Sequence, residues 1–247
     1  MYEEYAKAHV IIFKVSGFCA LIAAFLILIW FISLFTLPQP DRQNSIEENL
    51  LFVANHTAAW ISGPLILFFF TLIQIPILIA LFLLTRRLQY FLAHLGGIVG
   101  LIYIIFCSQT YFRLFSAIPR LARIYATTKH EIEKYAIIAN FDGWGHLNSH
   151  SLAYNLDILG YTFLGLMCIL FGVSLLSPIK LRTLAGWLLL VSGFINILGI
   201  IGYIIRHSTV ELGIIAAAVF YFIACIAMFP MFFQEAQVLN ATATKAK

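Results

Sequence analysis

The chain has 247 residues, of which 62% are hydrophobic and 11% are charged, and its formal net charge is +4. Charged residues make up about 25% of an ordinary soluble domain, so this composition excludes a soluble globular fold of this length. The basic residues are scattered and form no stripe with interleaved aromatic residues, which argues against a nucleic-acid partner. We therefore expect one membrane domain that takes up nearly the whole chain.

Six apolar runs of 22 to 24 residues follow one another along the sequence. The hydrocarbon core of a bilayer is about 30 Å thick and needs about 20 helical residues to cross it. Each run is therefore long enough to span a membrane. We predict an all-α, polytopic bundle of six transmembrane helices over residues 15–37, 61–84, 91–112, 156–177, 183–205 and 210–233, with one long extramembrane segment at 113–155.

Two of the three segments that separate the first four spans are long and polar. Residues 41–60 are expected to form a polar loop, and the second span then contains Gln74 two residues before Pro76, which predicts a kink. In the long extramembrane segment, apolar and aromatic residues recur at alternating steps of three and four, which indicates one face of a helix. We expect an amphipathic helix at the outer interface that starts near Pro119 and carries on that face Ile118, Leu121, Tyr125, Thr128, Ile132, Tyr135 and Ala139.

The Lys and Arg residues of the short connections predict the orientation, because such residues are more frequent on the cytoplasmic side. If both termini are cytoplasmic, the inner side holds eight of them and the outer short loops hold only Arg42 and Arg206. The long segment adds five outer basic residues, but the rule is weaker for long segments. We expect a multi-pass protein of the cell membrane with the N- and C-termini in the cytoplasm. The eight inner residues are Lys7, Lys14, Arg86, Arg87, Lys180, Arg182, Lys245 and Lys247.

The sharpest local pattern is a pair of histidines, His146 and His150, with Asp142 four residues before the first. Histidines at i and i+4 share one helix face and can bind one metal ion. We expect no cofactor, and zinc is the alternative. The same expected side of the membrane carries other possible ligands. Against a metal site, two glycines interrupt this stretch and no Glu stands beside either histidine as a general base. Ordinary polar loop residues are the simpler interpretation. The other possible ligands are His56, His207, Asp157 and Glu211.

Polar residues within the spans are few, and Gln74, Gln109 and Asn196 are the candidates for a small ligand-binding cavity. A mid-membrane amide is costly unless it is paired, so such residues often face the interior of a bundle. Hydrogen bonds that only fix helix packing are the competing interpretation. No Asp, Glu, Lys or Arg lies in the middle third of any span. We expect no intramembrane carboxylate or histidine relay, which argues against proton pumps and ion channels.

Three stretches resemble an uncharacterised family of bacterial integral membrane proteins with six predicted transmembrane helices. They are Pro119–Ala126 after the third span, Leu159–Leu166 in the fourth, and Arg182–Gly193 leading into the fifth. The resemblance covers the region from the second span to the fifth, and its motifs are helix-packing and turn patterns. It implies a six-helix bundle in a bacterial cell membrane, and it carries no activity and no functional residues.

The sequence thus favours a non-enzymatic membrane protein that binds lipid or another hydrophobic ligand, or that serves as an accessory membrane subunit. Membrane lipids are its expected partners, and a second membrane protein or a further copy of the chain is a possible one. A metal-dependent membrane hydrolase with an outward-facing site at His146, His150 and Asp142 is the alternative. A transporter of a small neutral solute is the second alternative.

Overall fold

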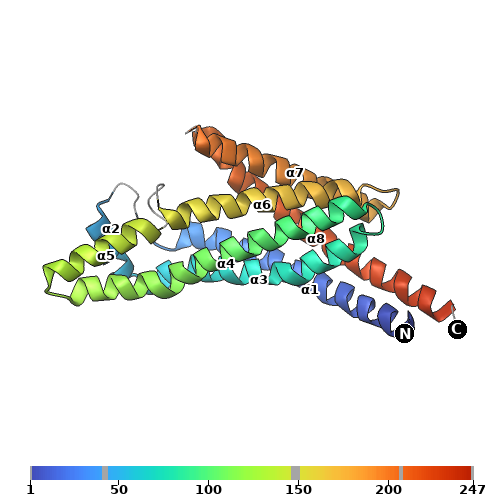
Figure 1. The fold of residues 1–247 in the computed structure, drawn as a ribbon, viewed down its shortest axis with the longest axis horizontal. Coiled ribbons are helices and arrows are strands. Elements are labelled where there is room, and N and C mark those ends of the chain that lie inside the picture. Colours follow the sequence, from blue (N-terminus) through green and yellow to red (C-terminus); the bar gives the residue numbers. More distant parts are fainter. Residues whose placement is uncertain (1, 41–43, 146–150, 206–207, 246–247) are drawn as a thin grey trace.

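A computed structural model describes residues 2–40, 44–145, 151–205 and 208–245 of the chain. Within these residues the polypeptide forms eight α-helices and no strand (Figure 1). The helices are α1 (Tyr2–Thr36), α2 (Ile46–Asn55), α3 (Thr57–Thr85), α4 (Tyr90–Thr127), α5 (Glu131–Trp144), α6 (Leu152–Leu175), α7 (Lys180–Ile204) and α8 (Ser208–Lys245).

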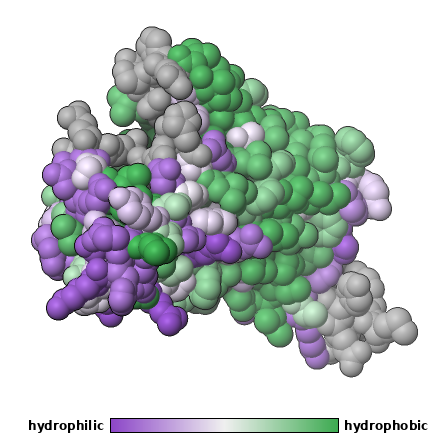
Figure 2. All heavy atoms as spheres, turned by 60° about the vertical axis from the view of Figure 1, so that its left-hand side comes forward, coloured by the Kyte–Doolittle hydropathy of each residue, from purple (hydrophilic) through white to green (hydrophobic). Residues whose placement is uncertain are grey.

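Six of these helices, α1, α3, α4, α6, α7 and α8, are long and apolar enough to cross a membrane. Figure 2 shows the corresponding surface, in which a broad hydrophobic belt covers the bundle and hydrophilic residues lie at both ends of it, most of them at one end. The predicted all-α bundle of six spanning helices is therefore confirmed. Both termini lie at the same end of the bundle (Figure 1), as an even number of spans requires.

The six spans form a ring in chain order. Each span packs on the next one along the chain, and α8 packs back on α1. Near the termini α1 and α8 lie side by side, with the rings of Phe18 and Phe233 in edge-to-face contact at 5.3 Å between centroids. Toward the other end of the bundle the two helices diverge (Figure 1). The ring is consequently tight at the terminal end and wider at the end that carries the long connections.

Glycines bring α6 and α7 into direct backbone contact. A Cβ atom at Gly193 would lie 2.6 Å from the carbonyl oxygen of Gly165, and one at Gly172 would lie 2.9 Å from that of Gly186. Because no side chain fits in these gaps, the two helices pack as closely as small residues allow in a membrane. Gly199 and Gly213 play the same part between α7 and α8, so these two helices stay together as a hairpin.

An ion pair closes the terminal end of the ring. Arg182 in the first turn of α7 donates through Nε and Nη2 to the two carboxylate oxygens of Glu235 in α8, and both distances are 2.6 Å. The two side chains are 15% and 9% exposed, respectively. Such a bidentate pair fixes the relative position of two helices as well as contributing electrostatic energy.

The opposite end of the bundle contains two short helices. Residues 46–55 were expected in a polar loop but form α2, which begins with a capping box in which Ser45 and Glu48 satisfy each other's main-chain N–H groups. The Ser-x-x-Glu spacing is the sequence signal of such a helix start. Helix α2 packs on α4 and α5, so the segment covers the end of the bundle.

A helix lies between the third and fourth spans, as expected, but its boundaries and its buried face differ from the prediction. Helix α4 runs through Pro119 without interruption and ends at Thr127, and α5 starts separately at Glu131. A helix of 38 residues is about 57 Å long, so α4 extends well beyond a bilayer core. The buried residues of α5 are Ile137 and Phe141, whereas Ile132 and Tyr135 of the expected face are exposed. The spacing of apolar residues by three and four continues across the turn between the two helices, so the sequence pattern did not indicate the turn.

Candidate functional site

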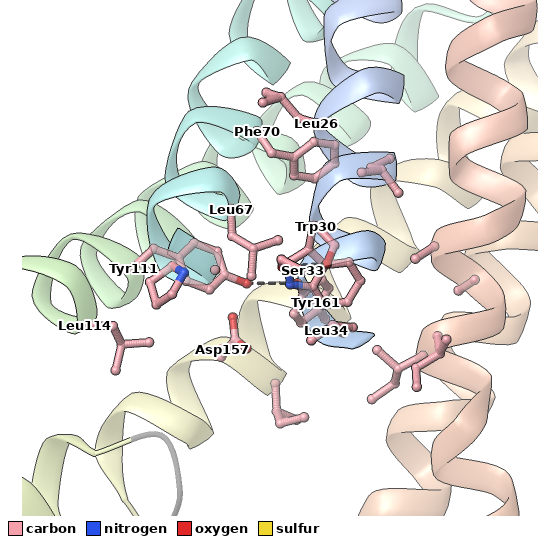
Figure 3. A pocket seen from close by; sticks show the side chains of 18 of the residues that line it. Leu26, Trp30, Ser33, Leu34, Leu67, Phe70, Tyr111, Leu114, Asp157 and Tyr161 are labelled. Atoms are coloured by element: carbon pink, nitrogen blue, oxygen red, sulfur yellow. Dashed lines mark hydrogen bonds between the residues drawn. The ribbon is translucent and has the colours of Figure 1, made fainter. Parts of the chain in front are cut away.

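A cavity of about 750 Å³ lies inside the ring, in the half of the bundle away from the termini. All six spans line it, mostly with aliphatic and aromatic side chains such as Trp30, Leu67 and Phe70 (Figure 3). Pockets that bury small molecules usually measure about 300–1,000 Å³ and combine an apolar wall with a few polar groups. The size and wall of this cavity therefore match those of a ligand-binding pocket.

A pair of tyrosine hydroxyls crosses the cavity wall between α4 and α6. The hydroxyl oxygens of Tyr111 and Tyr161 are 2.8 Å apart and hydrogen-bonded. Whichever tyrosine accepts this bond keeps its own proton for another acceptor. Asp157 lies one helical turn before Tyr161, is 6% exposed and also lines the cavity. Its carboxylate points from α6 toward the side on which Tyr111 lies (Figure 3).

Asn196 of α7 forms a second polar point in the wall. Its Nδ2 donates to the main-chain oxygen of Tyr161 at 2.9 Å, and its side chain is 3% exposed. The Oδ1 atom of the same amide has no hydrogen-bond partner among the described residues. The amide thus joins α7 to α6 through its N–H group, and its oxygen remains without a hydrogen bond among the described residues.

The inner end of the cavity is closed by hydrogen bonds between distant helices. The hydroxyl of Tyr221 in α8 donates to Oε1 of Gln74 in α3 at 2.6 Å. Ser192 in α7 donates to the main-chain oxygen of Ala217 in α8 at 2.9 Å. These bonds hold α3, α7 and α8 together at the depth where the ring narrows.

Two aromatic contacts hold the wall nearer the connecting end. The indole N–H of Trp60 in α3 donates to the main-chain oxygen of Leu114 in α4 at 2.9 Å. The rings of Tyr154 in α6 and Tyr203 in α7 lie 5.2 Å apart between centroids. Adjacent helices are therefore joined here by large side chains, which keep their backbones further apart than the glycines do.

The structure separates the three polar residues that the sequence indicated for ligand binding. Asn196 lines the cavity. Gln74 is buried behind it and is linked to it through Tyr221, with its Nε2 atom unpaired among the described residues. Gln109 is exposed on the outside of α4 and is not among the lining residues. Only two of the three are thus associated with the cavity.

Sequence reasoning missed the polar residues that α6 contributes to the cavity wall. No buried carboxylate was expected in the bundle, yet Asp157 is buried and lines the cavity. It lies near the start of its span, outside the middle third that was searched for charge. The spacing of Asp157 and Tyr161, four residues apart, would have placed both on one helix face. Together with Tyr154 three residues earlier, this pattern was the available signal.

The proposed zinc ligands are only partly covered by the structure. His146 and His150 lie outside the described residues, as does His207. Asp142 lies in the last turn of α5. Among the residues that the structure does describe, no group of three or more His, Cys, Asp or Glu side chains is placed to hold a metal ion. The metal site at the two histidines stays a prediction from the sequence.

Comparison of the chain with protein-family models, with curated proteins and with solved structures gave no match.

Proposed function

We propose that this protein binds a hydrophobic or amphipathic ligand, such as a membrane lipid, in the cavity enclosed by its six spans. The observation that carries the proposal is the cavity itself, about 750 Å³ in volume with an apolar and aromatic wall. Burial of apolar surface contributes roughly 25 cal/mol per Å², so such a wall favours a hydrocarbon chain over a water-soluble solute. A few polar groups on α4, α6 and α7 are available to orient one end of the ligand.

The arrangement of α1 and α8 supports a ligand that comes from the membrane. Both helices line the cavity, α1 with residues that include Leu26 and Trp30, and α8 with residues that include Leu212 and Ile215. They pack together near the termini and diverge where they border the cavity (Figure 1). The proposal is that a ligand dissolved in the bilayer enters between these two helices and so reaches the cavity without crossing the aqueous phase.

The proposal includes the orientation of the protein in a cell membrane, with both termini in the cytoplasm. The distribution of basic residues supports it, because the terminal end of the bundle carries Arg86 and Arg87 in a short connection and Lys180 and Arg182 in the first turn of α7. Labelling of single cysteines with a membrane-impermeant reagent tests this part. The expected result is labelling of residues in the segment 128–130 in intact cells, and none near residue 88. The reverse pattern would contradict the orientation and leave the binding proposal intact.

Two glycines give a matched test of ligand binding. Gly63 lines the cavity, and a Cβ atom placed on it would meet nothing within 4 Å. Gly143 in α5 has the same open surroundings but lies outside the cavity. The substitution Gly63→Phe should therefore fill the cavity without displacing the backbone, and Gly143→Phe should serve as its control.

The measurement is the content of small amphiphilic molecules in the purified protein, extracted and identified by mass spectrometry. Wild type and Gly63→Phe are compared with Gly143→Phe in the same mild detergent. We expect roughly tenfold less bound ligand in Gly63→Phe, because the new ring occupies space that the ligand would fill. A tenfold loss corresponds to about 1.4 kcal/mol of binding free energy. Equal content in all three proteins would contradict the proposal.

A further inference from the structure

The cavity ends at the middle of the two shortest spans. Leu164, the lining residue of α6 nearest the terminal end, is the thirteenth of the 24 residues of that helix, and Ser192 of α7 is the thirteenth of 25. Helices of this length measure about 36–38 Å, which is little more than the bilayer core of about 30 Å. Their midpoints therefore lie near the middle of the membrane, and the cavity lies on the side of the connecting end (Figure 1).

The depth of the cavity matches that of one membrane leaflet. Along α3 the lining residues extend from Ala59 to Phe70, and along α7 from Ser192 to Tyr203. Each of these stretches rises by about 16 Å along its helix axis, at about 1.5 Å per residue. The hydrocarbon core of one leaflet is half of about 30 Å, or about 15 Å. The cavity and the lipid chains of the leaflet beside it consequently occupy the same range of depth.

The wall is more polar at its outer end than at its inner end. Tyr154 and Tyr203 border the outer part, and Asp157 follows Tyr154 by about one turn of α6. At the inner end the hydroxyls of Ser192 and Tyr221 are used in hydrogen bonds within the protein. The other lining residues near the inner end are apolar, namely Leu26, Ile27, Leu67, Phe70, Leu164, Ala217 and Ala218. An amphiphile in the cavity therefore places its polar head toward the connecting end and its hydrocarbon part toward the middle of the membrane.

This direction is also that of a lipid in the leaflet on the connecting side. Such a lipid has its head at the interface and its chain ends near the middle of the bilayer. If it enters sideways between α1 and α8, it keeps both its depth and its direction. Burial of a polar head without hydrogen-bond partners costs free energy, and sideways entry avoids moving the head through the hydrocarbon core.

We infer that the ligand is a lipid of the leaflet on the connecting side, which keeps its head near Tyr154 and Tyr203 and extends a hydrocarbon chain along the cavity toward Phe70. This inference rests on the proposed function and adds to it the leaflet, the direction and the chain length of the ligand. Three bonds of an extended chain advance about 3.3–3.6 Å. A chain of about 12–14 carbons consequently reaches the inner end of the cavity.

The test is a series of primary alcohols with chains of about 8 to 18 carbons, which brackets the length that the helix rise predicts. Each alcohol displaces radiolabelled dodecanol from the wild-type protein in lipid nanodiscs, and its affinity is expressed relative to its partition into the lipid. A short chain leaves a void at the inner end and so loses contacts, whereas a long chain has to fold back. We expect an optimum at about 12–14 carbons, with octanol and octadecanol bound about tenfold more weakly.

A matched pair of substitutions tests which end of the cavity sets the optimum. Phe70→Ala enlarges the inner end and should move the optimum to chains about two to four carbons longer. Phe194→Ala is the control, since Phe194 lies on α7, is 56% exposed and is not a lining residue. Affinity that is independent of chain length would overturn this inference alone, whereas the absence of any displaceable alcohol would overturn the proposed function. Because the series is measured on wild type, it stands even if Phe70→Ala fails to fold.

The position of a bromine atom tests the direction of the ligand. Trp60 borders the outer part of the cavity, and it is the one tryptophan left in a variant with Trp30→Phe, Trp144→Phe and Trp187→Phe. Dodecanol brominated next to its hydroxyl group should give stronger saturable quenching of Trp60 than dodecanol brominated at the chain end. Equal quenching by the two compounds, or stronger quenching by the second, would overturn the inferred direction.

Discussion

The two halves of the six-helix ring are built from the same chain segments but pack in opposite ways. In the terminal half, Gly165, Gly172, Gly186 and Gly193 let α6 and α7 touch through their backbones. In the other half the same two helices meet through Tyr154 and Tyr203 and through the amide of Asn196. Between α6 and α7, small residues pack the terminal half closely and larger polar and aromatic residues join the half that borders the cavity, whereas α7 and α8 stay in close contact there through Gly199 and Gly213.

This difference shows how one bundle combines closely packed helices with an internal cavity. Without a hydrophobic driving force between helices in lipid, close van der Waals packing and interhelical polar contacts must supply the stability. The terminal half has the close glycine contacts between α6 and α7, and Arg182 and Glu235 add a bidentate ion pair there, whereas hydrogen bonds join the helices in both halves. The half with the cavity is then free to keep its helices apart.

The largest effect is expected from breaking the ion pair of the terminal half. Arg182→Met leaves the buried carboxylate of Glu235 without its partner, so the free energy of unfolding should fall by roughly 3–5 kcal/mol. Unfolding in mixed micelles, followed by circular dichroism, measures this change. Lys180→Met, an exposed residue of the same helical turn, is the control and should change little.

The double substitution Arg182→Met with Glu235→Met sharpens the result. Replacement of both partners removes the uncompensated charge, so most of the lost stability should return. A single substitution that costs no more than an exposed ion pair, about 1 kcal/mol or less, would show that the pair is solvated and that the terminal half is not held in this way.

Adding one methyl group in each half makes a direct comparison. In Gly193→Ala the new Cβ would lie 2.6 Å from the carbonyl oxygen of Gly165, so the helices must separate and the protein should lose about 1–3 kcal/mol of stability. In Gly63→Ala the new atom meets nothing within 4 Å beyond its chain neighbours, so the change should be small, about 1 kcal/mol or less, because the gain in helix propensity is opposed by the ring of Pro64. Thermal unfolding of the two variants gives the difference. A similar change of the same sign in both would remove the distinction between the halves.

The smallest effect concerns the wall of the cavity itself. Trp60→Phe removes the indole N–H that donates to the main-chain oxygen of Leu114 and so unlinks α3 from α4. A loss of about 1 kcal/mol is expected, which is the typical net value of one hydrogen bond. Amide hydrogen exchange should show it as faster exchange in the neighbouring turns of α3 and α4. Unchanged exchange there, with faster exchange in α6 and α7, would contradict this assignment.

The sequence was sufficient for the architecture because six uninterrupted apolar runs have only one way to satisfy their backbone groups in lipid, which is as helices. It was less informative at the helix ends. The apolar period around Thr128 continued across the turn between α4 and α5, and so a single helix was expected where the structure has two. The capping box at Ser45 was readable but was passed over in a segment that looked polar.

The cavity could be anticipated only in part. Asn196 was singled out because an amide in an apolar run needs a partner, and this physical reason led to a residue of the cavity wall. The same reason led to Gln109, which is exposed on α4, because one sequence does not show which way a helix is rotated. The divergence of α1 from α8 depends on packing over the whole ring, and no local pattern predicts it.

Fluorescence quenching tests most directly whether the cavity is a binding site. Trp30 and Trp60 line it, so a variant with Trp144→Phe and Trp187→Phe reports on the cavity alone. Brominated dodecanol in nanodiscs should quench this emission saturably, unlabelled dodecanol should reverse the quenching, and the added substitution Gly63→Phe should weaken the saturable quenching about tenfold. Quenching that rises linearly with bromine content and is the same with Gly63→Phe would contradict the account.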